Sequence, residues 1–377
     1  MARITLENVV KEFAGRRGRA VRALDRLSLD VAEGERVAIL GPSGSGKTTL
    51  LRVIAGLEMV TEGRVAIDGR DAAGLAPQDR EMAMVFQRDA LLPHLSAREN
   101  IELGLKLRGQ SRDEISRRVQ EASEFFGLHA VLERLPRALS GGERQRAALA
   151  RAFVRQPSAF LLDEPLAGLD APYRAKLREE IIGLHRHVGS TLIVVTHDQE
   201  EAMALGSRVA VIDRGALQQV AEPSALYHRP VTAFVAGFIG SPPMNLFRGT
   251  LAFEGGAVWF HGDDDSSLSL CLTEAQRKMV PATKQKQITL GLRPEHIFHT
   301  LEGRSIPYGS EVEAVVECAH FLGAEAVVHW SCGTTRFVTR TPSSAVPAVN
   351  ASFRLIFDMA HAHFFDGATG QAVAPGS

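Results

Sequence analysis

The sequence has no excess of charge of either sign, because its 43 lysine and arginine residues almost balance 44 aspartate and glutamate residues. It therefore has no global basic field that could hold nucleic acid or an anionic membrane non-specifically. It also has no uninterrupted apolar run near the roughly 20 residues that a membrane span needs. Residues 1–5 lack the apolar stretch of a signal peptide. We expect a cytosolic protein that reaches a membrane only through a protein partner.

Cysteine is scarce as well. The three cysteines, Cys271, Cys318 and Cys332, are odd in number and do not have the spacing of metal ligands. They are typical of reduced thiols in a cytosolic protein, and we expect them to be buried structural residues. His361 and His363 alternate and would share one face of a strand, but without further ligands they do not predict a metal site.

A chain of 377 residues is long enough for two or three compact units, each with a core of its own. Alternating apolar residues between positions 4 and 37 predict antiparallel strands. The apolar run of residues 37–40 predicts a buried parallel strand that feeds a helix over residues 48–55. Residues 159–162 and 191–195 predict two further buried strands, each with polar residues at its carboxyl end.

The style of the sequence changes near residue 238. Before it, a stretch rich in Arg, Glu, Leu and Ala interrupts the strand pattern and predicts an inserted helical subdomain over about residues 88–155. After it, Pro and Gly punctuate short alternating strands. We therefore predict an α/β domain over residues 1–238, with antiparallel β and helical subdomains, and an all-β domain over residues 239–377.

A glycine-rich loop follows the first predicted parallel strand. Its sequence, Gly-Pro-Ser-Gly-Ser-Gly-Lys-Thr over residues 41–48, fits G-x-x-x-x-G-K-[ST]. It lies between a predicted strand and a predicted helix, which is the context that this motif requires and which argues against a chance glycine-rich turn. Backbone N–H groups of such a loop wrap phosphates, Lys47 reaches the β- and γ-phosphates, and Thr48 binds Mg²⁺. The loop alone does not distinguish a kinase, a GTPase and a motor. The residues predicted to bind the nucleotide here are Gly41, Pro42, Ser43, Gly44, Ser45, Gly46, Lys47, Thr48 and Thr49.

The run Leu-Ser-Gly-Gly-Glu-Arg-Gln-Arg over residues 139–146 resembles the signature sequence of ABC ATPases, which other phosphate-loop families lack. The resemblance implies that Ser140, Gly141 and Gly142 bind the γ-phosphate of the nucleotide held by the opposite subunit. That family usually has glutamine where this chain has Glu143. Ser140 is also a typical helix N-cap with Glu143 at the third helical position, which explains the helix start but not the two glycines.

The run Ala-Phe-Leu-Leu-Asp-Glu over residues 159–164 resembles the Walker B strand of the same family. The resemblance implies that Asp163 holds Mg²⁺ through water and that Glu164 is the general base for the attacking water. Acids after an apolar strand are otherwise often plain solvated strand ends. His197 follows another predicted buried strand and matches the switch histidine of the family, which contacts the γ-phosphate. A lone histidine would otherwise be structural.

Three further residues carry the resemblance. Gln87 resembles the Q-loop glutamine, which contacts Mg²⁺ and the hydrolytic water. Asp170, in Ala-Gly-Leu-Asp, resembles the D-loop that touches the partner subunit. Phe13 lies where the family places an aromatic ring on adenine, with an apolar strand residue as the alternative. The catalytic residues implied by the resemblance are Lys47, Gln87, Glu164 and His197.

Beyond about residue 244 the chain resembles the OB-like accessory domain of importer ATPases for maltose, sn-glycerol 3-phosphate and related solutes. Gly-Leu-Arg-Pro-Glu-His over residues 291–296 is the most recognisable segment, with shorter matches at 241–245, 322–325 and 363–366. The resemblance implies the ATP-hydrolysing subunit of a carbohydrate, polyol or sn-glycerol 3-phosphate importer, with ATP and Mg²⁺ as cofactors. The alternatives are an importer ATPase for polyamine, iron or sulfate, and a soluble ABC ATPase without a membrane partner.

The resemblance also implies partners. One phosphate loop and one signature cannot complete a site in a family whose nucleotides lie between two subunits arranged head to tail, so a second ATPase subunit, in a homodimer, is implied. Two membrane-spanning permease subunits would hold the protein at the cytoplasmic face of the inner membrane, and an extracytoplasmic solute-binding protein would act indirectly. OB-like barrels can bind oligonucleotides, but this tail has no basic run interleaved with aromatic residues, so we expect no nucleic acid.

Overall fold

The computed structural model describes residues 1–15, 20–86, 91–263, 268–278, 287–299 and 309–373. The chain forms two compact units, residues 1–223 and 224–377. These units differ from the predicted domains, residues 1–238 and 239–377, by a segment that holds two short helices, and the domain boundary stays a prediction. Within the described ranges, no helix has both the length and the apolar character to cross a membrane.

The first unit opens with a four-stranded antiparallel sheet made of β1 (Ile4–Phe13), β2 (Val21–Val31), β4 (Glu62–Ile67) and β5 (Arg70–Asp71). β1 lies between β2 and β4, antiparallel to both. Alternate residues of β2, namely Leu27, Leu29 and Val31, are buried, as the period of a half-buried strand requires. The predicted antiparallel strands are therefore confirmed.

The second sheet of this unit contains β3 (Arg36–Leu40), β6 (Met82–Val85), β7 (Ala159–Asp163), β8 (Thr191–Thr196), β9 (Arg208–Asp213) and β10 (Ala216–Ala221). The strand order is β10-β9-β3-β8-β7-β6, parallel except for β10 at the edge. Every residue of β7 and β8 is buried, which explains their continuous apolar sequence. The carboxyl ends of β3, β7 and β8 meet at one edge, where such sheets bind ligands.

The two faces of this sheet pack against different cores. On one face, Leu161 and Ile193 pack with the helix α1 (Lys47–Ala55) and the antiparallel sheet. On the other face, Phe160 and Leu162 pack with α5 (Ala171–Val188), α6 (Gln199–Leu205) and helices inserted between β6 and β7. Alternation along each strand thus buries both faces and fixes the sheet between two layers.

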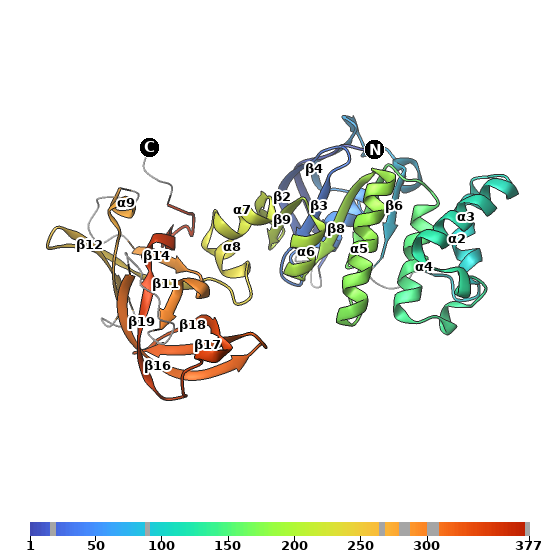
Figure 1. The fold of residues 1–377 in the computed structure, drawn as a ribbon. Helices are drawn as coiled ribbons and strands as arrows, with labels where there is room; N and C mark the ends of the chain where they lie inside the picture. Colours follow the sequence, from blue (N-terminus) through green and yellow to red (C-terminus); the bar gives the residue numbers. More distant parts are fainter. Residues whose placement is uncertain (16–19, 87–90, 264–267, 279–286, 300–308, 374–377) are drawn as a thin grey trace. The chain divides into compact units, whose positions relative to one another are not determined.

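The predicted helical insertion is present in the described residues. It consists of α2 (Ala97–Leu107), α3 (Arg112–Phe126) and α4 (Gly141–Phe153), with short 3₁₀ turns at His129–Val131 and Pro136–Ala138. Figure 1 shows the three helices grouped beyond β6. The rings of Phe125, Phe126 and Phe153 pack on one another at centroid distances of 4.9 to 5.8 Å and join α3 to α4.

The second unit contains two five-stranded antiparallel sheets, in the orders β13-β12-β11-β14-β20 and β15-β19-β16-β17-β18. The strands of the first are β11 (Asn245–Glu254), β12 (Ala257–Gly262), β13 (Ser269–Cys271), β14 (Gln287–Leu292) and β20 (His363–Asp366). Those of the second are β15 (Ile297–His299), β16 (Gly309–Phe321), β17 (Glu325–Cys332), β18 (Thr335–Pro342) and β19 (Ser352–Asp358). Their inward residues, including the fully buried Trp330, form a shared core.

Short helices accompany these sheets: α7 (Pro223–His228), α8 (Ala233–Phe238), α9 (Glu274–Arg277) and 3₁₀ turns at Pro294–His296, Ser343–Ala345 and Met359–His361. Arg293, from the most recognisable predicted segment, is 2% exposed. Its guanidinium donates hydrogen bonds to the carbonyls of Tyr227 and Ile239 and lies 3.8 Å from the Tyr227 ring centroid. It thereby fastens α7 and α8 to the β-structure of the second unit.

Two predictions about side chains in this unit were wrong. His361 lies in a 3₁₀ turn whereas His363 begins β20, so the two do not share a strand face. Of the three cysteines, Cys332 is buried, but Cys271 and Cys318 are only half-buried. The alternation of a strand does not reveal where a turn or a bulge resets it, which explains the errors at His361 and at Cys318.

Candidate nucleotide site

The loop of residues 41–48 joins β3 to α1 in a conformation that only glycine permits at key positions. Gly46 has φ +101°, and a Cβ there would come within 2.3 Å of the Ala23 carbonyl oxygen. A Cβ at Gly41 would come within 2.1 Å of the Ile212 carbonyl oxygen. No side chain of the described residues caps α1 at Gly46, so the N–H groups of its first turn can receive an anion.

Lys47 folds back over this loop. Its Nζ donates to the carbonyl oxygens of Gly41 and Pro42, both at 2.8 Å, and the residue is 6% exposed. Burial lowers the pKa of the Lys47 ammonium, and the carboxylates of Glu164 and Asp163 act in the opposite direction. The loop therefore holds one buried cation beside free helix N–H groups, an arrangement that fits a chain of phosphates.

The two predicted Mg²⁺ ligands that the structure describes lie together. Thr48 Oγ1, in the first turn of α1, donates a hydrogen bond of 3.1 Å to Asp163 Oδ1, at the end of β7. Asp163 is 4% exposed, and burial raises the pKa of its carboxyl group. A hydroxyl and a carboxylate are the hard oxygen ligands that Mg²⁺ prefers, so the donor set fits this ion.

Glu164 and His197 form a pair at the same edge of the sheet. His197 Nδ1 lies 3.1 Å from Glu164 Oε1. Glu164 has φ +47°, uncommon for a residue with a side chain, and its N–H donates to the Val195 carbonyl at 2.8 Å. Strained backbone of this kind concentrates at functional sites. The sequence predicted both residues, and the structure adds their contact.

The signature segment begins α4. Ser140 Oγ accepts a hydrogen bond from the Glu143 N–H at 3.2 Å, and Glu143 Oε2 accepts one from the Ser140 N–H at 2.7 Å. This capping box confirms the N-cap interpretation, and the same hydrogen bond lowers the pKa of Glu143. Gly142 is close to the Tyr173 ring, which a Cβ would approach to 3.3 Å. Gly142 therefore lets the start of α4 approach the Tyr173 ring closely.

The remaining predicted site residues have mixed outcomes. Phe13 is the last residue of β1 and is 36% exposed. Lys11 Nζ lies 4.8 Å from the centroid of its ring. Asp170 Oδ1 accepts a hydrogen bond from the Tyr173 N–H at 3.4 Å and caps α5. Gln87 lies outside the described residues. The roles of these three residues stay predictions.

The sequence did not reveal the support behind the loop. Arg80 is 8% exposed, and its guanidinium donates to the carbonyl oxygens of Val53, Ile54 and Ala72 at 2.8 to 2.9 Å. The first two carbonyls belong to the last turn of α1, so Arg80 fixes the helix whose other end is the phosphate loop. No signal in the sequence could have identified it, because its partners are backbone groups.

A hollow with a volume of 180 Å³ lies between β6, α2 and α4. It is lined by apolar residues such as Val85, Phe86 and Leu107 and by Arg151 and Arg155, and burial lowers the pKa of both arginines.

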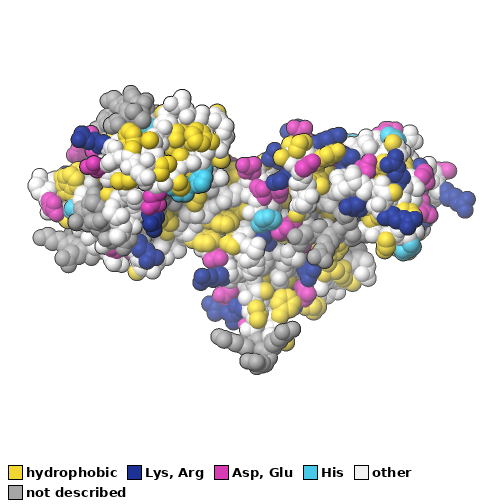
Figure 2. All heavy atoms as spheres, turned by 90° about the horizontal axis from the view of Figure 1, so that it is seen from below, with side chains coloured by type: hydrophobic (Ala, Val, Ile, Leu, Met, Phe, Trp, Pro, Cys, Tyr) yellow, Lys and Arg dark blue, Asp and Glu magenta, His cyan; other side chains and the backbone are white. Residues whose placement is uncertain are grey.

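On the face shown in Figure 2, acidic and basic side chains are interspersed, in keeping with the balanced composition.

The phosphate loop, the capped signature helix and the acids at the strand ends define an ABC-type ATPase. Residues 24–167 match the ABC transporter family, residues 240–297 the MalK OB fold domain, and residues 290–365 the TOBE domain. A solved dimer of the ATP-binding cassette MJ0796, bound to ADP and Pi, is 34% identical with a TM-score of 0.54. The match covers 58% of this chain and 98% of the cassette.

The chain belongs to the ABC transporter family, as an ATP-binding protein with a C-terminal OB/TOBE domain. It is 43% identical over 372 residues to the sn-glycerol-3-phosphate import ATP-binding protein UgpC of Burkholderia thailandensis, covering 98% of this chain and 99% of the relative. It is 42% identical to UgpC of Escherichia coli and to the ABC transporter ATP-binding protein YurJ of Bacillus subtilis. Each of these matches covers 99% of this chain and 100% of the relative. The predicted family and fold class are thus confirmed.

Proposed function

We propose that this chain hydrolyses ATP to energise an ABC importer for a small polyhydroxylated solute, namely a carbohydrate, a polyol or sn-glycerol 3-phosphate. The observation that carries this proposal is its similarity, over nearly the full length, to import ATP-binding proteins for sn-glycerol 3-phosphate. The paired MalK-type OB and TOBE segments support the same class. An importer ATPase for polyamine, iron or sulfate is the alternative.

The first unit offers a binding site for ATP and Mg²⁺. The N–H groups of the loop and the ammonium of Lys47 bind the phosphates, and Phe13 stacks on the adenine. Thr48, Asp163 and Gln87 hold Mg²⁺, which neutralises charge on the β- and γ-phosphate oxygens when bound. The contact between Thr48 and Asp163 supports this assignment.

Glu164 is the general base. Its carboxylate accepts a proton from the water that attacks the γ-phosphate, and His197 holds the carboxylate in place through the 3.1 Å contact. His197 thus positions Glu164 and, as a catalytic residue, also contacts the γ-phosphate.

Each site is completed by a second copy of the chain. Ser140, Gly141 and Gly142 present helix N–H groups to the γ-phosphate held by the opposite subunit, and Asp170 lies at the contact. The solved dimer of a similar cassette supports this arrangement. ATP binding closes the homodimer and hydrolysis releases it.

Two membrane-spanning permease subunits receive this motion. The hollow between β6, α2 and α4 offers apolar walls and two arginines to a short permease helix. The chain would then lie at the cytoplasmic face of the membrane, and an extracytoplasmic binding protein would deliver the solute.

The general base is tested with Glu164→Gln. We expect ATP binding to remain, turnover to fall by about a thousandfold or more, and closed dimers to accumulate on a sizing column with ATP. Glu179→Gln, the same change on the exposed face of α5, is the control and should hydrolyse ATP normally. Near-normal hydrolysis by Glu164→Gln would refute the assignment.

The transport role is tested by capturing the Glu164→Gln protein with ATP from membranes of its own host. Recovery of multi-span proteins supports the importer, whereas recovery of ribosomal or DNA-repair proteins without them contradicts it. The assembled complex is then assayed for ATPase stimulation by its binding protein with sn-glycerol 3-phosphate, sugars, polyols, sulfate, iron or polyamine. Stimulation by one of the last three alone would overturn the solute class.

A further inference from the structure

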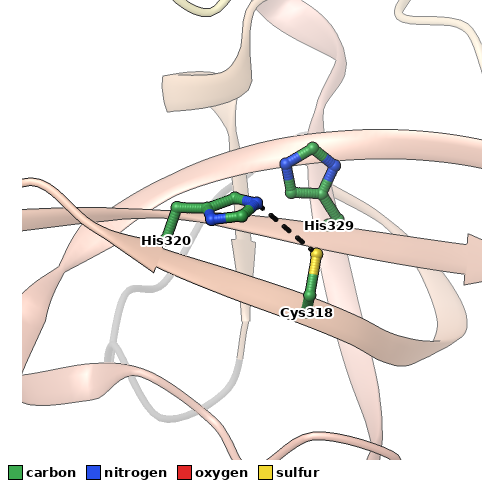
Figure 3. Close-up of side chains that lie close together, drawn as sticks. All are labelled: Cys318, His320 and His329. Atoms are coloured by element: carbon green, nitrogen blue, oxygen red, sulfur yellow. Dashed lines mark hydrogen bonds between the residues drawn. The ribbon is translucent and has the colours of Figure 1, made fainter.

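Three side chains of the second unit converge on the outer face of a sheet. Cys318 and His320 belong to β16, and His329 belongs to β17 (Figure 3). Cys318 is the direct cross-strand partner of His329, and His320 lies two residues further along β16 on the same face. One ligand atom from each of the three residues lies within 4.8 Å of the others.

A β-bulge creates this arrangement. Up to Val316, the even-numbered residues of β16 face the core, and simple alternation would direct Cys318 and His320 inward as well. The register shifts between Val316 and Cys318, so that Ala319 packs against the core and Cys318 turns outward. Bulges re-aim side chains in this way and are over-represented near functional sites.

The distances fit a tetrahedral ion. Zinc bonds of about 2.3 Å to sulfur and about 2.05 Å to nitrogen place two such ligands about 3.6 Å apart at the tetrahedral angle. Cys318 Sγ lies 3.7 Å from His320 Nε2. The rings of His320 and His329 are 5.1 Å apart and nearly perpendicular, at 88°. In-plane lone pairs from perpendicular rings can point at one ion.

A second cluster in the same unit lacks this geometry. His296, Asp358 and His361 also lie within 4.8 Å of one another. However, the His296 and His361 rings are stacked at 4.0 Å and 7°. The lone pairs of parallel rings lie in separate planes and cannot converge on one ion. We therefore use this second cluster as a control for metal binding at Cys318, His320 and His329.

We propose that Cys318, His320 and His329 bind a zinc ion, with water at the fourth position. One thiolate and two imidazoles suit this borderline-soft ion better than Mg²⁺ or Ca²⁺. Two carboxylates of β16 and β17 are engaged in ion pairs, because Glu317 pairs with Arg336 and Glu325 with Arg340. The fourth position is therefore open to solvent, and the ion ties β16 to β17.

The test uses Co²⁺ as a spectroscopic probe on the reduced, full-length protein. We expect one Co²⁺ per chain to give a thiolate-to-metal absorption band in the near ultraviolet, which an equivalent of Zn²⁺ removes. Octahedral Co²⁺ in the nucleotide site has no thiolate and gives no such band. Zn²⁺ should also raise the urea midpoint of tryptophan fluorescence, since it binds the folded unit.

Variants decide the assignment. Cys318→Ser should abolish the band, and His329→Gln should weaken Co²⁺ binding by at least about tenfold. Cys271→Ser and His361→Gln, outside the cluster, should change neither. The proposal is overturned if the band survives Cys318→Ser, if His329→Gln binds Co²⁺ like the unmodified protein, or if no band forms. In the last case Cys318 and His320 make a hydrogen bond and nothing more.

Discussion

The two units of this protein bring reactive side chains together in different ways. In the first unit, Lys47, Asp163 and His197 lie at or beyond the carboxyl ends of three parallel strands, which meet at one edge of a sheet. In the second unit, Cys318 and His329 meet because two antiparallel strands pair in one particular register. Strand ends always meet in a parallel sheet, whereas a cross-strand pair depends on every residue of the intervening turn and on each bulge.

The same contrast applies to charge. One buried cation of the first unit, Lys47, faces a loop that fits a chain of phosphates, and its carboxylate neighbours support the charged form. Arg293, a buried cation of the second unit, donates its hydrogen bonds to the backbone carbonyls of Tyr227 and Ile239. We therefore expect Lys47 to serve the reaction and Arg293 to serve the fold. The chain contains two tryptophans, Trp259 and Trp330, both in the second unit, so tryptophan fluorescence reports the unfolding of that unit.

The largest expected effect comes from Lys47→Ala. It removes the cation that reaches the phosphates, so ATP hydrolysis should fall by about a thousandfold or more. The urea midpoint of tryptophan fluorescence should not change. Lys176→Ala, on the exposed face of α5, is the control and should hydrolyse ATP normally. A shifted urea midpoint would show that the two cations do not have separate roles.

Arg293→Met should have the opposite profile. Loss of its hydrogen bonds leaves two carbonyls unpaired and should lower the free energy of unfolding of the second unit by about 2–3 kcal/mol, measured by urea titration of tryptophan fluorescence. Arg336→Met is the matched control, since its ion pair with Glu317 is exposed to solvent and should contribute little to the free energy of unfolding. Equal destabilisation by both variants would contradict the assigned role.

The smallest effect concerns pH. Burial, with a further contribution from Arg293, His296, His228 and His361, lowers the pKa of His363 from 6.5 to about 4. The folded state disfavours the charged imidazole of His363. The contribution of neutral His363 to the free energy of unfolding is therefore present above about pH 6.5 and is lost as the pH falls towards about 4.

His363→Gln should therefore flatten the fall of the urea midpoint of tryptophan fluorescence between these two pH values. The corresponding variant of an exposed histidine in the first unit, His129→Gln, should leave the fall unchanged. If His363→Gln retained the full fall, the acid sensitivity would belong to other groups of the second unit.

Much of the nucleotide site could be predicted because each motif is continuous in the sequence. The loop of residues 41–48 and the acids of residues 163–164 lie where the apolar strands before them end, and the structure joins Thr48 to Asp163 as this topology requires. Arg80 could not be predicted, because it acts on backbone carbonyls that any sequence provides. The contact of Glu164 with His197 required the structure as well, since it depends on a backbone angle.

The sequence by itself determined the family and the order of the elements and predicted which residues bind the phosphates, because local patterns carry all three. Only the tertiary structure decided which distant side chains meet. It placed Cys318 outside the core, against the period of two, and opposite His329. The physical reason is that strand register and bulges depend on packing of the whole sheet, which a single strand does not contain.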